Sequence, residues 1–80
     1  MTFTKWLDTF LSEKGIDPET TFDVDGPSGF NLIPVGSLVE MMKQAPATEQ
    51  IGIKRMIIKI DFLNGNVLDY FKHLARAVAA

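Results

Sequence analysis

The spacing of apolar residues near the start of the chain constrains its fold more than any other feature. Large apolar side chains recur there at the interval of an amphipathic helix, at Phe3, Trp6, Leu7, Phe10 and Leu11. Gly15 follows, where a glycine with positive φ commonly ends a helix, and Ile16 can then fold back onto Leu11. We therefore predict a helix over residues 3–14 that buries one face.

The C-terminal segment has the same periodicity. Its apolar stripe consists of Val67, Phe71, Leu74 and Val78. Asn66 stands where a side chain can cap a helix, and Asp69 lies in the first turn, where an acidic group interacts favourably with the helix dipole. We predict a helix over residues 66–79.

A shorter helix is expected before Pro46. Ser37 and Glu40 have the spacing of a capping box, in which two free amide donors at the start of a helix are satisfied reciprocally. Proline cannot continue a helix, so this element should end before Pro46. We predict a helix over residues 38–44.

Residues 48–63 fit a helix or a strand. As a helix, the segment has a wide apolar face formed by Ile53, Met56, Ile57, Ile60 and Leu63. A narrow face lies opposite and consists of Ile51, Ile58 and Phe62. As a strand, residues 55–62 would alternate, isoleucine favours β structure, and the Asn64-Gly65 pair that follows is a hairpin signal.

The helical interpretation of residues 48–63 is favoured because the segment after Gly65 reads as a helix and offers no partner strand. The predicted fold class is therefore mainly α, a single domain over residues 1–80 with about four helices. The alternative is an α+β fold with residues 55–62 as a strand.

The stretch "TFDVDGPSGFNLIPVG" is expected to form a short β-hairpin or extended arms at residues 21–33, with Pro27 in the turn. The apolar side chains Phe22, Val24, Phe30 and Leu32 are expected to cover the helices. Asp23 and Asp25 are expected to point apart. The stretch does not have the ligand spacing of a calcium loop, and it lacks the lysine of a phosphate-binding loop.

The residue inventory excludes several kinds of chemistry. The chain has no cysteine, which removes disulfides, thiol nucleophiles and cysteine-bound zinc, and His73 is its only histidine. We predict no catalytic residue, no metal ligand and no cofactor. The start of the chain lacks the long apolar run of a signal peptide or membrane span, so a cytoplasmic protein is expected.

These features favour a small non-enzymatic interaction module, acting as an adaptor, inhibitor or assembly partner. Mean hydropathy is positive although a chain of 80 residues buries only about 60–65% of its unfolded surface. We predict a homodimer, or a complex with another protein, that covers the narrow face Ile51, Ile58 and Phe62. In the alternative, the first and last helices of the same chain cover the two faces. Short acidic chains without cysteine are common among bacterial and mobile-element accessory proteins.

A nucleic-acid-binding regulator is the second functional hypothesis. Residues 48–79 superficially resemble a helix-turn-helix, with basic candidate contacts at Lys54, Arg55, Lys59, Lys72, His73 and Arg76. The charge is −4 over residues 1–46 (three Lys, seven Asp or Glu) and +2 over residues 47–80 (five Lys or Arg, three Asp or Glu). The overall pI near 5.1 and Asp69 at the start of the second helix both argue against this hypothesis.

Overall fold

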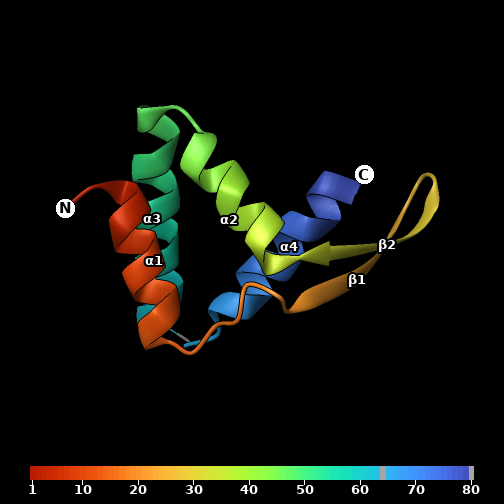
Figure 1. Cartoon of the computed structure of the whole chain (residues 1–80), viewed down its shortest axis with the longest axis horizontal. Helices are drawn as coiled ribbons and strands as arrows, with labels where there is room; N and C mark the ends of the chain where they lie inside the picture. The colour runs from red at the N-terminus through yellow and green to blue at the C-terminus, as the bar shows by residue number, and fades with distance from the viewer. Residues whose placement is uncertain (64, 80) are drawn as a thin grey trace.

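Four α-helices and one β-hairpin make up residues 1–63 and 65–79, the part of the chain that the computed structural model describes (Figure 1). In chain order the elements are α1 (Phe3–Glu13), β1 (Thr21–Gly26), β2 (Gly29–Pro34), α2 (Val35–Gln44), α3 (Ala47–Leu63) and α4 (Val67–Ala79). The mainly helical fold class with a short hairpin is confirmed. The boundaries of the predicted helices differ from the observed ones by a few residues.

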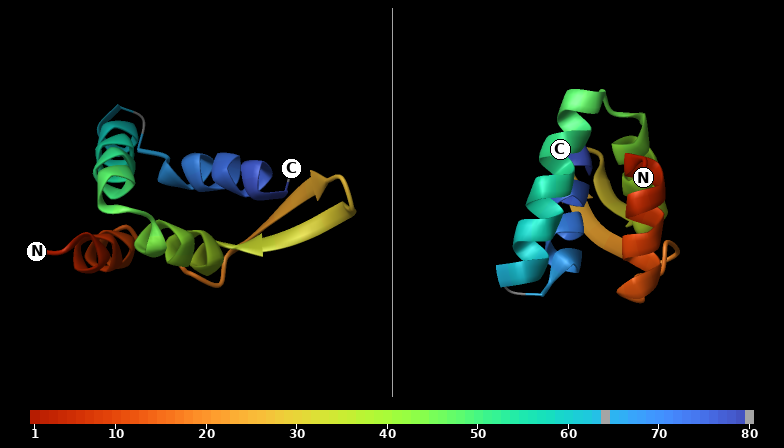
Figure 2. Two further views of the ribbon diagram at one scale, coloured as in Figure 1. Left: turned by 90° about the horizontal axis from the view of Figure 1, so that it is seen from above. Right: turned by 90° about the vertical axis from the view of Figure 1, so that its left-hand side faces the viewer.

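The helices lie in two layers, and the hairpin projects from one end of them. Seen from above, α1 and α2 form one layer, and α3 and α4 form the other (Figure 2). The longest dimension of the molecule is 39 Å. α1 and α3 lie at one end of this axis and the tip of the hairpin lies at the other, while α4 contacts β1 (Figure 1).

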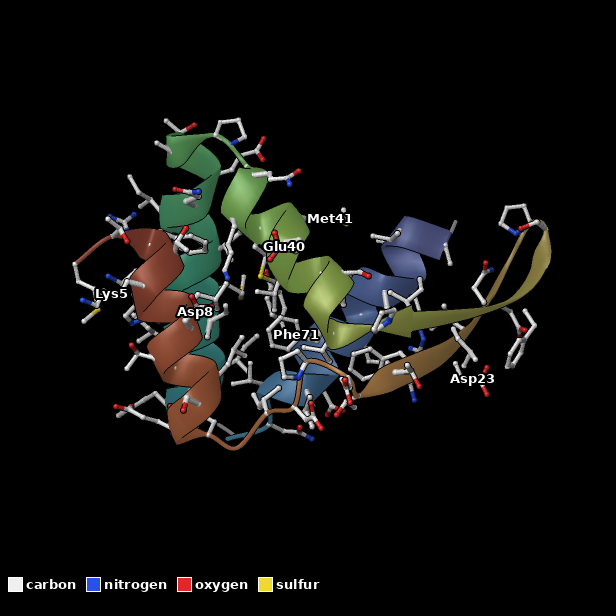
Figure 3. The ribbon with its side chains drawn as sticks, viewed as in Figure 1. Lys5, Asp8, Asp23, Glu40, Met41 and Phe71 are labelled. Atoms are coloured by element: carbon white, nitrogen blue, oxygen red, sulfur yellow. The ribbon has the colours of Figure 1, made fainter. Side chains whose placement is uncertain are left out.

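One apolar core joins the helices and β1. The largest fully buried side chains are Phe71, Leu7, Ile57 and Val35, one from each helix. Figure 3 shows Phe71 in the middle of the molecule, between the helices. Complete burial of side chains of this size contributes about 1.5–3 kcal/mol each, so each of these residues stabilises the fold substantially.

The ends of α1 follow the signals in its sequence. Thr2 caps the first turn, because its side-chain oxygen accepts a hydrogen bond from the amide of Lys5 at 3.2 Å. At the other end, Gly15 has a φ of 67°, and the amide of Ile16 donates to the carbonyl of Leu11 at 2.9 Å. This is the Schellman arrangement that the sequence predicts.

α2 begins differently from the prediction. The helix starts at Val35, so Ser37 lies inside it, and the capping box with Glu40 is wrong. The first amides are satisfied by the loop after α1 instead. The amide of Val35 donates to the carbonyl of Thr20, and that of Gly36 donates to the carbonyl of Pro18, both at 2.8 Å.

α3 is helical throughout, which contradicts the alternative of a strand over residues 55–62. Gly65 follows it with a φ of 68°, and its amide donates to the carbonyl of Ile60 at 3.1 Å. Asn64, half of the Asn-Gly hairpin signal, lies outside the described residues. On the wide face only Ile57 is fully buried. Ile53 and Ile60 are half-buried, and Met56 and Leu63 are exposed.

The pairing of the two hairpin strands shows that the predicted packing of their apolar residues is wrong in part. Gly26 pairs with Gly29, so Asp25 lies opposite Phe30 and Asp23 lies opposite Leu32. Directly opposed residues share a face of the sheet, and so do residues two apart in one strand. Phe22 and Val24 face the helices as expected. Phe30 and Leu32 do not, because they share the outer face with both aspartates, which therefore do not point apart.

α4 packs its apolar stripe into the core, but one residue of the predicted stripe lies outside the core. Val67, Phe71 and Ala75 are buried and Leu74 is half-buried, whereas Val78 near the C-terminal end is exposed. Just before the helix, the Asn66 side-chain amide donates to the carboxylate of Asp69 at 2.9 Å.

Candidate protein-interaction surfaces

The predicted interface residues lie together on the uncovered side of α3. Ile51, Ile58 and Phe62 are separated by seven and four positions, so they follow one line along the helix. Their exposed fractions are 53%, 47% and 86%. We call these three residues the α3 strip.

α1 packs on α3 without covering the α3 strip. The ammonium of Lys54 lies over the Trp6 ring, 5.2 Å from its centroid, and Lys14 Nζ is 3.0 Å from an Asp61 carboxylate oxygen. Ile57, between these contacts on the helix, is completely buried. The alternative in which the first and last helices cover both apolar faces of α3 is therefore wrong for the α3 strip.

Two basic side chains adjoin the α3 strip. Arg55 is four positions after Ile51 and three before Ile58, and Lys59 is three positions before Phe62. Residues at these spacings are neighbours on a helix surface. Both side chains are exposed, so the α3 strip is an apolar surface with a positive border.

The basic residues of the nucleic-acid hypothesis differ in their surroundings. Lys54 is half-buried against Trp6, which reduces its availability to a phosphate. The other candidates are exposed, namely Arg55, Lys59, Lys72, His73 and Arg76. Lys72, His73 and Arg76 belong to α4, and Arg55 and Lys59 belong to α3.

The outer face of the hairpin is a second exposed apolar surface, because Phe30 and Leu32 lie on it and do not cover the helices as predicted. Phe30 and Leu32 are 65% and 61% exposed, next to the exposed Asp25 and Asp23. We call these four residues the outer hairpin face. Figure 3 shows Asp23 out on the hairpin, away from the helices. Residues 21–34 contain no Lys or Arg, so this face is apolar and negative.

An apolar groove of about 450 Å³ lies between α2, α3 and α4. It is lined by Leu38, Met41, Met42, Ala45, Glu49, Ile53, Tyr70, Leu74, Ala77 and Val78. Figure 3 shows Met41 on the α2 wall. Tyr70 lies on the α4 side of the groove, and its burial raises the pKa of its phenol above the usual value of 10.0. The groove was not predicted, because it depends on how three helices are inclined to one another.

Within the described residues, the side chains that could bind a metal ion are dispersed. Across residues 1–63 and 65–79, no group of three or more His, Asp or Glu side chains could hold a metal ion. His73 is exposed on α4. In the same part of the chain, no helix is both long enough and apolar enough to cross a membrane.

Comparison of the chain with models of protein families, with curated proteins and with solved structures finds no match. The surfaces described above are therefore the basis for a functional conclusion.

Proposed function

We propose that this protein is an interaction module that assembles as a homodimer through the α3 strip. The observation that carries the proposal is the exposure of Ile51, Ile58 and Phe62 along one line of α3. Burying an Ile or Phe side chain contributes about 1.5–3 kcal/mol when the burial is complete. Contiguous apolar patches on a small protein commonly mark sites of association.

The packing of α3 supports an external cover for these side chains. One side of the helix already contributes Ile57 to the core, and α1 is held beside it by the Lys14–Asp61 ion pair. The α3 strip lies beyond these contacts. A second molecule can cover it without rearrangement of the fold. We propose a binding role, as an adaptor, inhibitor or assembly partner, because apolar side chains are what this surface offers.

The test is the molar mass in solution, measured by light scattering at high micromolar concentration. We expect a dimer for the wild type and a folded monomer for Ile58→Asp. Met56→Asp is the matched control, because Met56 is similarly exposed and points in nearly the opposite direction from α3.

Two results would contradict the proposal. One is a wild type that stays monomeric, and the other is an Ile58→Asp variant that stays dimeric. A dimeric Ile58→Asp variant together with a monomeric Met56→Asp variant would place the interface on the opposite side of α3. Circular dichroism of each variant establishes that it is folded.

A further inference from the structure

We propose that the α3 strip of one copy binds the outer hairpin face of a second copy, and that the two copies exchange this contact reciprocally. The inference rests on the proposed function and names the surface that covers the α3 strip. It is carried by the match between an apolar surface with a positive border and an apolar surface with two carboxylates.

The charges of the two surfaces are opposite and similar in number. Arg55 and Lys59 border the α3 strip, while Asp23 and Asp25 lie on the outer hairpin face beside Leu32 and Phe30. α3 itself carries two acidic residues, Glu49 and Asp61. Asp61 pairs with Lys14, and Glu49 lines the groove. Apolar contact between these surfaces therefore brings unlike charges together.

Pairing of either surface with itself is disfavoured by the same charges. Two α3 strips face to face would place Arg55 and Lys59 of both copies near one another. Two outer hairpin faces would bring four carboxylates together. Like charges across an interface disfavour that pairing, so the mixed contact is preferred.

The shape of the molecule makes this contact intermolecular. The hairpin and α3 lie at opposite ends of the 39 Å axis, so the hairpin of one copy does not cover its own α3 (Figures 1 and 2). A two-fold axis across the long dimension exchanges the two ends. Each hairpin can then lie on the α3 of the other copy, and the contact is made twice.

The doubled contact enlarges the interface. A stable interface buries about 800 Å² on each partner, contributed by roughly 20–30 residues. The three side chains of the α3 strip are too few for such an interface. The reciprocal arrangement adds the outer hairpin face of each copy.

The experiment reverses the charge of each surface separately. The hairpin variant carries Asp23→Lys and Asp25→Lys, and the helix variant carries Arg55→Glu and Lys59→Glu. Each alone places like charges in both contacts, so we expect the dimer dissociation constant to rise about tenfold or more. The control for the helix variant is Lys72→Glu with Arg76→Glu, the same charge change on exposed residues of α4, which should leave the dimer unchanged.

Mixing the two charge variants is the decisive step. In a mixed dimer, both contacts again join opposite charges, so equimolar hairpin and helix variants should restore the dimer. The combined four-residue variant should also dimerise. Mass measurements by sedimentation at low salt give all of these constants, and circular dichroism establishes that each variant is folded.

The outcomes separate this inference from the proposed function. If Ile58→Asp abolishes the dimer but mixing the hairpin and helix variants does not restore it, the inference is overturned. The α3 strip is then covered by another surface. If the α4 control weakens the dimer equally, a general charge effect replaces the specific contact and the inference is also overturned. A monomeric wild type overturns both proposals.

Discussion

α3 and α4 are neighbouring helices, both rich in apolar residues, and they use those residues in different ways. In α4 the residues form one stripe, and Val67, Phe71 and Ala75 are buried in the core. In α3 they surround the helix, and Ile57 is the one that is completely buried. A single core can cover one side of a helix, so apolar residues on the other side remain available to a partner.

The largest expected effect on stability comes from a substitution in the core at α4. Phe71→Ala should reduce the free energy of unfolding by about 3–5 kcal/mol, because it leaves a cavity where a fully buried ring was. Phe62→Ala removes the same ring from α3, at a site that is 86% exposed. At concentrations where the chain is monomeric, it should change stability by no more than about 0.5 kcal/mol.

Urea unfolding followed by circular dichroism measures both phenylalanine variants. An equal loss of stability in the two would mean that Phe62 is covered within its own chain, and the contrast between α3 and α4 would disappear.

Two glycines, one against α4 and one in α3, allow the same comparison with substitutions that should change stability less. A Cβ at Gly26 would collide with the carbonyl oxygen of Ala79 at the end of α4, whereas a Cβ at Gly52 in α3 meets open space. Gly26→Ala should therefore destabilise the fold by about 1–3 kcal/mol through overpacking. Gly52→Ala should stabilise it by about 0.5–1 kcal/mol, because alanine is the better helix former.

Thermal unfolding of the two alanine variants shows directly whether each substitution stabilises or destabilises the fold. A stabilising Gly26→Ala would contradict the close contact between the hairpin and α4. A destabilising Gly52→Ala would contradict the open surroundings of that part of α3.

The smallest expected effect concerns Tyr70, in the groove beside α3. Burial raises the pKa of its phenol in the folded chain, so the unfolded chain ionises at lower pH. Stability from this group is fully present below the ordinary pKa of 10.0 and falls as pH rises through the folded pKa. Tyr70→Phe should remove the contribution of this phenol to the loss of stability at high pH, as measured by urea unfolding on both sides of pH 10. An unchanged pH dependence would show that the phenol is solvated.

Local sequence signals were enough to predict the helices. The apolar periods and the helix ends at Gly15 and Gly65 depend on near neighbours, and the helices that they predict are present. The start of α2 could not be predicted in this way, since the acceptors for its first amides are Pro18 and Thr20 in a distant loop. Tertiary contacts replaced the expected cap.

The surfaces were predictable to different degrees. The α3 strip follows from the two-sided pattern of α3. The outer hairpin face could also have been predicted, because a turn with Pro27 and Ser28 at its centre pairs Gly26 with Gly29 and so places Phe30 opposite Asp25. In that register the apolar residues of β1 and those of β2 lie on opposite faces of the hairpin. The groove depends on helix inclination, for which the sequence holds no local signal.

The central claim is that the exposed side of α3 is an interaction surface, whereas the apolar stripe of α4 is used by the core. A dilution series of isotope-labelled protein, followed by NMR, tests it most directly. From millimolar to low micromolar concentration, we expect the amide signals of Ile51, Ile58 and Phe62 to shift, and those of Phe71 and Ala75 to stay unchanged. Signals of the α3 strip that do not change over this range, together with a monomeric mass, would contradict the claim.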